Sequence, residues 1–155
     1  MTVGATGIPV RRMTDADLER VLEIERGSFR SPWSRQAFES ELRKPYGMPF
    51  VYDDGGLVAG YCIAWKVADE MHVANLAVDP ARRRRRIAET LLRSLLETAP
   101  ECTWIGLEVR RSNDAARTLY RKLGFIDAGV RKGYYVDANE DAILMVKSIH
   151  PLHQR

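Results

Sequence analysis

The middle of the chain constrains the fold more than any other part of it. An apolar run at residues 73–78 is followed by five consecutive arginines at positions 82–86. Apolar side chains then recur at helical spacing over residues 87–99, and residues 103–109 alternate between apolar and other side chains. These periodicities predict a strand, a basic loop, a helix and a second strand.

A basic loop between a strand and a helix N-terminus is an anion-binding arrangement. Backbone N–H groups and the positive end of the helix dipole point at the same place. If the anion is a pyrophosphate, the chain is a cofactor enzyme. If it is a nucleic-acid backbone, the chain is a binding module. The net charge of +3 is mild, but five of the 24 basic residues fall in this loop. One basic loop suits a small polyanion about as well as a nucleic acid.

The whole chain predicts the element order βααβββαβαββ. This order indicates an α/β (α+β) fold with a central mixed sheet and helices on both faces. Strands are expected around residues 8–12, 50–52, 57–67, 71–78, 103–109, 125–130 and 142–146. Helices are expected over residues 14–27, 34–42, 87–99 and 112–124, with Ser112 as the cap of the last one and a loop around residues 133–135.

Bulk properties restrict the class of protein. The length of 155 residues fits a single domain over residues 1–155. No apolar stretch approaches the roughly 20 residues that span a bilayer, and the N-terminus lacks signal-peptide features, so a cytoplasmic protein is expected. Cys62 and Cys102 lie in apolar runs and are expected to be buried thiols. No metal-ligand spacing is present in the sequence, so no metal is expected.

Two residues are candidates for acid–base chemistry. Glu108 lies inside an otherwise apolar strand, on the same face as Trp104. It is either a surface or salt-bridged glutamate near the strand end, with Arg110 as a partner, or a general base in a partly apolar cleft. Tyr120 lies on the inner stripe of the following helix, where it is either a core residue or a proton donor.

Other polar and aromatic positions leave two interpretations open. Asn113 is either a helix cap or a ligand contact at the helix start. The adjacent pair Tyr134 and Tyr135, and Trp33 after Pro32, are either pocket residues or core residues. His72 is expected to be structural.

The motifs taken in order carry a resemblance to a known family. They are Asn75-Leu76-Ala77-Val78-Asp79-Pro80, the basic loop and helix, Leu107-Glu108-Val109-Arg110, Ser112-Asn113-Asp114-Ala115-Ala116 and Leu119-Tyr120-Arg121-Lys122-Leu123-Gly124-Phe125. Ser31-Pro32-Trp33-Ser34, Gly133-Tyr134-Tyr135 and Glu140-Asp141-Ala142 add to them. The chain resembles the GCN5-related N-acetyltransferase (GNAT) superfamily. Within it, the chain is most similar to bacterial ribosomal-protein-alanine N-acetyltransferases and to archaeal protein N-terminal acetyltransferases.

The resemblance implies acetyl-CoA as the acetyl donor. The strand at Leu76, Ala77 and Val78 would pair with the pantetheine arm, and the loop and helix start would bind the pyrophosphate. The phosphate motif Gln/Arg-x-x-Gly-x-Gly/Ala falls on residues 83–88, with Arg86 at the glycine position. The implied cofactor contacts are Leu76, Ala77, Val78, Arg83, Arg84, Arg85, Arg86, Ile87, Ala88, Glu89, Asn113 and Tyr120.

The resemblance also implies roles in catalysis and acceptor binding. Glu108 matches the general base and Tyr120 the general acid. The peptide would lie between Phe29, Pro32 and Trp33 on one side and Tyr134 and Tyr135 on the other. The implied reaction is acetylation of a protein N-terminus, most readily the N-terminal alanine of a ribosomal protein. Acetylation of lysines or small amines is the alternative, followed by a non-catalytic RNA- or ribosome-binding module. Nucleic-acid and membrane partners are not expected.

Overall fold

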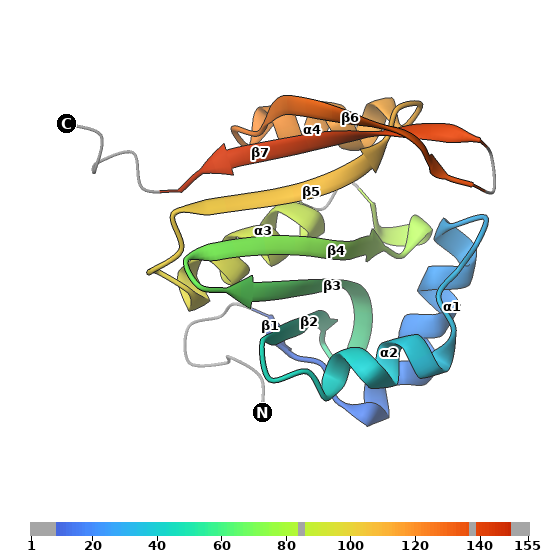
Figure 1. The fold of residues 1–155 in the computed structure, drawn as a ribbon. Coiled ribbons are helices and arrows are strands. Elements are labelled where there is room, and N and C mark those ends of the chain that lie inside the picture. Colours follow the sequence, from blue (N-terminus) through green and yellow to red (C-terminus); the bar gives the residue numbers. More distant parts are fainter. Residues whose placement is uncertain (1–8, 84–85, 137–138, 150–155) are drawn as a thin grey trace.

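A computed structural model describes residues 9–83, 86–136 and 139–149 of the chain. In this part of the chain, seven strands form one sheet in the order β1-β2-β3-β4-β5-β7-β6 (Figure 1). The strands are β1 (Val10–Arg12), β2 (Gly47–Asp54), β3 (Leu57–Val67), β4 (Glu70–Val78), β5 (Trp104–Arg110), β6 (Ile126–Tyr135) and β7 (Glu140–Ser148). Only the β4–β5 pair is parallel among these strands, so the predicted mixed sheet is confirmed.

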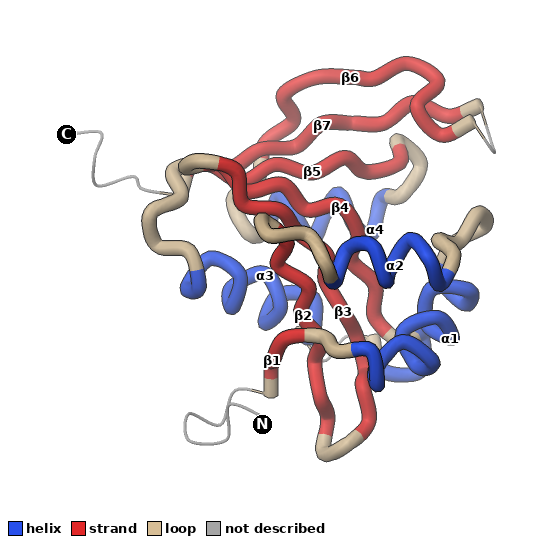
Figure 2. The backbone as a smooth tube through the Cα atoms, turned by 60° about the horizontal axis from the view of Figure 1, so that its bottom comes forward, coloured by secondary structure: helices blue, strands red, loops and turns tan. Residues whose placement is uncertain are grey.

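The helices lie on both faces of the sheet, as predicted. They are α1 (Leu18–Ser28), α2 (Arg35–Leu42), α3 (Ile87–Thr98) and α4 (Asp114–Lys122), with 3₁₀ turns η2 (Asp15–Asp17) and η3 (Pro80–Arg82). The helices α1 and α2 pack on one face, while α3 and α4 pack on the other (Figures 1 and 2). Among the described residues, none of the helices has the length and apolar character needed to cross a lipid bilayer.

Each face of the sheet has its own hydrophobic core. On one face, Leu91 and Leu95 of α3 pack over Cys62 of β3. On the other face, Leu18 of α1 packs with Tyr61, the neighbour of Cys62. Successive side chains of β3 therefore pack into opposite cores, because side chains along a strand alternate between the two faces of the sheet. Cys102 is also buried, so both cysteines are buried thiols as predicted, and burial raises the pKa of Cys62.

The parallel pair β4 and β5 separates partway along its length. Its ladder joins Glu70–Val73 to Trp104–Leu107 and ends there. Beyond that point β4 continues along β3 as far as Val78, while β5 continues along β7 as far as Arg110. The two strands therefore diverge in the middle of the sheet, and the β5-facing edge of the last part of β4 has backbone groups available for another partner.

A β-bulge in β4 changes the direction of its side chains just before this divergence. Val73 pairs with Ala64 and Asn75 pairs with Ile63, so Ala74 is the extra residue. Because side chains alternate with period two, one inserted residue reverses the faces of those that follow. Asn75 consequently faces α1, and Leu76 faces the core under α3 and α4.

Two local predictions are wrong. Tyr134 and Tyr135 belong to the end of β6 rather than to a loop, because the hairpin of β6 and β7 extends to the Tyr135–Glu140 pair. The cap of α4 is Asn113 rather than Ser112. The Asn113 side chain accepts the N–H of Ala116 at 3.1 Å, and its backbone lies outside the helical region.

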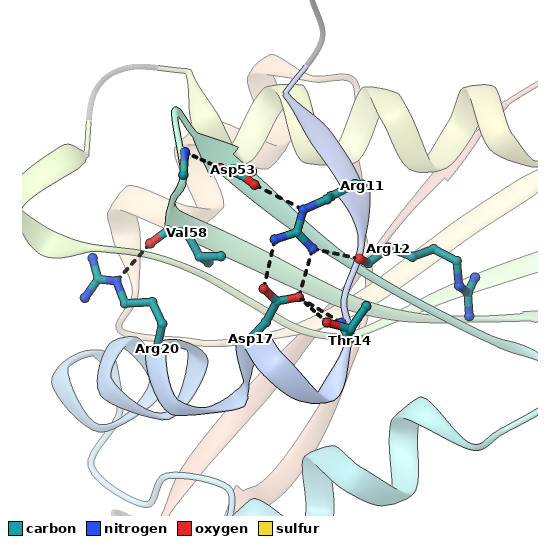
Figure 3. A network of polar contacts seen from close by, with 8 residues as sticks. Arg11, Arg12, Thr14, Asp17, Arg20, Asp53 and Val58 are labelled. Carbon is teal, nitrogen blue, oxygen red and sulfur yellow. Dashed lines mark hydrogen bonds and ion pairs between the residues drawn. The ribbon is translucent and has the colours of Figure 1, made fainter. Parts of the chain in front are cut away.

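A network of ion pairs joins the first strand to its neighbours (Figure 3). Both terminal nitrogens of Arg11 donate to the carboxylate of Asp17 at 2.9 Å, and its Nε donates to Asp53 at 3.1 Å. The Asp17 carboxylate also accepts the N–H of Thr14 at 2.8 Å. One guanidinium therefore fixes the start of the first helical segment against β1 and β2.

Candidate active site

Two clefts lie where β4 and β5 diverge. The α3-side cleft, of about 610 Å³, lies between β4, the start of α3 and one side of α4. The α1-side cleft, of about 450 Å³, lies between the end of α1, β5 and the end of β6. Both clefts are lined by Ser28, Phe29, Leu76, Asn113, Ala116 and Tyr120. The divergence of the two strands therefore joins one cleft to the other.

The α3-side cleft contains most of the residues expected at a cofactor site. Its lining includes the strand residues Leu76, Ala77 and Val78, and the loop and helix-start residues Arg83, Arg86, Ile87, Ala88 and Glu89. Asn113 and Tyr120 line it from α4. Arg84 and Arg85 lie outside the described residues. Sequence reasoning did not include Leu119 and Lys122, which also line this cleft.

The N-terminus of α3 lines this cleft, and its first backbone N–H groups have no partner within the helix. The first bond within the helix runs from the N–H of Thr90 to the carbonyl of Arg86, at 3.0 Å. The N–H groups of Ile87, Ala88 and Glu89 precede it and have no earlier carbonyl of the helix to bind. Together with the helix dipole they attract an anion.

The described arginines of the run at positions 82–86 make different contacts. Arg82 forms ion pairs with Asp54 and Asp79, so it fixes the loop to the rest of the fold. Arg83 donates to the carbonyl of Val78 at 3.3 Å and to the hydroxyl of Ser28 at 3.4 Å, across the cleft wall.

Arg86 stands where the phosphate motif has glycine, but its backbone adopts a conformation that is typical of glycine. The residue lies in the left-handed region, with φ 59° and ψ 25°, immediately before α3. This region is the one that glycine adopts without steric cost. The loop therefore has the shape that a glycine would allow, and it carries an exposed guanidinium beside the cleft.

Glu108 lies in the α1-side cleft, and it is also ion-paired. Its side chain is 25% exposed, and Oε2 lies 3.0 Å from Nε of Arg131 on β6. The partner expected from the sequence, Arg110, instead lies 3.5 Å from Glu140. Glu108 is thus salt-bridged, as the first interpretation expected, and it also lines a cleft, as the second expected.

Tyr120 occupies the junction of the two clefts. Its side chain is 8% exposed, and its ring packs 5.7 Å from that of Phe125. Its hydroxyl has no hydrogen-bond partner among the residues that the structure describes. Burial is the main reason why the pKa of Tyr120 is raised, with smaller contributions from Cys62 and Tyr135. The phenol is therefore protonated at neutral pH and has a proton to donate.

Aromatic side chains form the rim of the α1-side cleft. Phe29 and Trp33 reach it from the α1–α2 turn, residues 29–34, and Tyr134 and Tyr135 reach it from β6. The two tyrosine rings stand edge to face at 5.1 Å. Burial, the largest cause, raises the pKa of Tyr135 to about 12. Pro32 lies in the same turn but is exposed, and it is not part of the lining that the described residues give either cleft.

Sequence reasoning gave no role to two polar residues on the inner wall of this cleft. Glu25 and Asn75 are both buried and line the α1-side cleft together. A signal was present, because Glu25 is the polar member of the apolar stripe of α1 and Asn75 interrupts an apolar strand. His72, expected to be structural, packs 5.0 Å from the ring of Trp104.

Comparison with known proteins agrees with this arrangement. Residues 18–125 match the acetyltransferase (GNAT) family. A Bacillus subtilis (strain 168) protein is 41% identical over 94% of this chain and 98% of its own length, and its name gives it provisionally as a ribosomal protein bS18-alanine N-acetyltransferase. The Escherichia coli (strain K12) protein of that name is 35% identical over 90% of this chain and 97% of its own length.

A solved structure shows the same fold. The crystal structure of the ribosomal-protein-S18-alanine N-acetyltransferase from Escherichia coli superposes with a TM-score of 0.83 at 34% identity. The match covers 90% of this chain and 92% of that one. The family and the fold predicted from the motifs are thereby confirmed. This chain belongs to the acetyltransferase (GNAT) family.

Proposed function

We propose that this protein transfers the acetyl group of acetyl-CoA to the α-amine of an N-terminal alanine, and that its acceptor is ribosomal protein bS18. The observation that carries the proposal is the meeting of two clefts at Tyr120. One cleft has the features of a cofactor site, and the other has an aromatic rim with a carboxylate inside it. The names of the relatives support the choice of acceptor.

The α3-side cleft suits the two chemically different parts of acetyl-CoA. The β5-facing edge of β4 beyond Val73, where its ladder with β5 ends, offers backbone groups to the amides of the pantetheine arm. The N-terminus of α3, with Arg83 and Arg86, offers donors and positive charge to the pyrophosphate. Asn113 and Tyr120 close the cleft from the α4 side.

The reaction needs a neutral amine and an acid for the leaving thiolate. A free α-amine has a pKa of about 8, compared with about 10.4 for lysine, so an N-terminus needs little help to lose its proton. Glu108 takes that proton, directly or through water, after its contact with Arg131 loosens. The amine nitrogen attacks the thioester carbonyl, and a backbone N–H near Ala77 or Val78 stabilises the oxyanion.

Collapse of the tetrahedral intermediate completes the transfer. The C–S bond breaks, and the departing CoA sulfur takes the phenolic proton of Tyr120. The remaining extra proton of the attacking nitrogen passes, directly or through water, to the Tyr120 phenolate and restores the phenol. Burial raises the pKa of this phenol, so it holds its proton in the resting enzyme. The acetyl group moves directly to the amine, so no acyl-enzyme is formed.

The α1-side cleft favours the end of a peptide chain over a free small amine. Its lining includes the α1–α2 turn and the end of β6 together with Glu108. A peptide backbone can hydrogen-bond to the turn and to β6 while its amine reaches Tyr120. One sheet supports both of these segments, so we propose that residues 1–155 act as a single domain, in the cytoplasm where a ribosomal acceptor is made.

The test is incubation with acetyl-CoA and a peptide with the N-terminal sequence of bS18, followed by mass spectrometry. We expect one acetyl group on the α-amine. Glu108→Gln and Tyr120→Phe should each lower kcat by roughly 10²- to 10⁴-fold, because each removes a proton-transfer group. Normal turnover in both variants would contradict the assigned roles.

Two further substrates separate the alternatives. Acetylation of a lysine in a peptide with a blocked N-terminus would favour a lysine acetyltransferase. Salt-dependent binding of RNA without any binding of acetyl-CoA would favour a binding module.

A further inference from the structure

Glu25 is a buried carboxylate for which the reaction described above has no use. Its residue exposure is 1%, although it lies on the wall of the α1-side cleft. Its Oε2 accepts the backbone N–H of Trp33 at 2.8 Å. Its Oε1 accepts Nδ2 of Asn75 at 2.8 Å and also the hydroxyl of Tyr61.

These three donors come from three different parts of the fold. Trp33 belongs to the α1–α2 turn, Tyr61 to β3 and Asn75 to β4. The bulge at Ala74 is what directs Asn75 toward α1. A single side chain therefore connects a surface turn to the central strands beside the junction of the clefts.

We propose that Glu25 is a positioning residue, which fixes the α1–α2 turn against β4 and thereby sets the shape of the acceptor site. This inference rests on the proposed function, because the turn supplies Phe29 and Trp33 to the cleft that would hold the peptide. The ring of Trp33 also packs 5.2 Å from that of Phe38, so the turn has an apolar contact in addition to this polar one.

The chemistry of the site requires a carboxylate. An ionised carboxylate is an acceptor at both oxygens, so it can satisfy donors on both sides. A glutamine of the same shape has one oxygen and one NH₂ group. If the NH₂ group faces the Trp33 N–H, that hydrogen bond is lost and a backbone donor remains unpaired. If it faces Tyr61 and Asn75 instead, the phenol and the amide must both change from donor to acceptor. The connection is therefore weakened on one side in either case.

The main experiment compares Glu25→Gln with wild type in steady-state transfer to the bS18 peptide. We expect KM for the peptide to rise about tenfold, since a shift of the turn misplaces one wall of the site. We expect KM for acetyl-CoA, and kcat at saturating peptide, to stay within about twofold of wild type. This is the result expected when a substitution weakens binding of the peptide equally in the ground state and in the transition state.

Glu41→Gln is the matched control. Glu41 is also a buried glutamate, 7% exposed, and it accepts Nε1 of Trp65 at 2.7 Å while pairing with Lys44 at 2.7 Å. It lies on α2 and lines neither cleft. Its substitution should lower the melting temperature without changing KM for the peptide. An equal rise in peptide KM for both variants would overturn the inference.

A second readout does not depend on transfer. Trypsin can cut after Arg30, which is exposed in the turn. Cleavage there, below the melting temperature, should be faster in Glu25→Gln than in Glu41→Gln or wild type, as the turn opens locally. If Glu25→Gln does not fold, Tyr61→Phe removes one donor, and a smaller rise in peptide KM is expected from it.

The outcomes separate the two proposals. If wild type transfers no acetyl group to any peptide, the proposed function fails, and the protease result alone decides whether Glu25 holds the turn. If wild type is active but Glu25→Gln has an unchanged peptide KM and an unchanged cleavage rate, the positioning role is wrong.

Discussion

Arg86 has an unfavourable backbone conformation, but its side chain carries a positive charge beside the proposed cofactor site. A non-glycine residue in the left-handed region costs roughly 1–2 kcal/mol relative to the right-handed one. Arg86 adopts that conformation at the N-terminus of α3 and places its guanidinium beside the α3-side cleft. Because the loop already has the conformation of a glycine, we expect the backbone N–H groups to remain accessible to an anion. The arginine side chain adds charge there.

Arg86→Gly should therefore separate stability from cofactor binding. The strain is relieved, and the larger freedom of glycine in the unfolded chain offsets part of the gain. We expect the melting temperature to rise by about 2 °C, as for a gain of up to roughly 1 kcal/mol in a chain of this size. We expect Kd for acetyl-CoA to increase about fivefold in calorimetry, because one charge near the phosphates is lost.

Arg86→Ala is the control for this prediction. It removes the charge but keeps a Cβ in the left-handed conformation, so its affinity should fall without any gain in melting temperature. Tighter binding of acetyl-CoA by Arg86→Gly would mean that the arginine obstructs the cofactor.

The surroundings of Glu108, a cleft and a salt bridge, could be predicted from the sequence, but its salt-bridge partner could not. A lone carboxylate in an apolar strand already points to a cleft or to a salt bridge. The observed partner, Arg131, belongs to β6, which is separated from β5 by β7. That neighbourhood follows from strand order, which local periodicity does not encode. The same limit hid the hydrogen bonds between Glu25 and the central strands.

At the scale of single elements, β4 shows what a periodic pattern can and cannot reveal. The apolar run predicted a strand, and β4 is a strand. The run did not predict the bulge, because alanine and asparagine fit a regular strand as well as a bulged one. Yet the bulge decides that Asn75 faces α1 and that Leu76 faces the α3-side cleft. The face of each site residue therefore depended on register, which is a tertiary property.

The loop between β4 and α3 gives a prediction about its own arginines. Arg82→Ala should lower the melting temperature by about 2–4 °C, since it removes partly exposed ion pairs worth about 1 kcal/mol, and KM for acetyl-CoA should not change. Arg83→Ala should instead raise KM for acetyl-CoA several-fold, because Arg83 lines the cleft. The pair is measured by thermal unfolding and steady-state kinetics. A large effect of Arg82→Ala on KM would refute this division of roles.

For the molecule as a whole, the Arg11 network makes stability depend on pH. Burial raises the pKa of Asp17, but hydrogen bonds from Arg11 and Thr14 outweigh it and lower the pKa below its usual value. A lowered folded-state pKa gives stability that is present above the unfolded value of about 4 and is lost as pH falls through the folded pKa.

We therefore expect the free energy of unfolding in urea to fall on acidification from pH 6 to pH 3. Asp17→Asn should be less stable than wild type at pH 6, by about 1–3 kcal/mol, because it weakens a charge-assisted pair. The difference should shrink at pH 3, which lies below the unfolded value of about 4, because the carboxyl of the unfolded chain takes up a proton there. A constant difference across this range would show that Asp17 does not contribute through its charge.

The order of elements and the mixed sheet could be predicted from the sequence. Each helix or strand shows its own spacing of apolar residues, and helix ends are marked by capping residues. The divergence of β4 and β5 could not be predicted, since both strands look uninterrupted in sequence. Beyond the point of separation, β4 keeps β3 as its neighbour and β5 keeps β7. The location of the candidate active site is consequently a property of the assembled sheet.

The divergence of β4 and β5 also gives each substrate of the proposed reaction a cleft of its own. The α1-side and α3-side clefts have separate linings apart from the residues that they share around Tyr120. Under the proposed function, a ribosomal protein can occupy the α1-side cleft while CoA leaves and acetyl-CoA arrives through the α3-side cleft. Geometry then imposes no compulsory order of arrival or departure, and the cofactor can be exchanged while an acceptor stays docked.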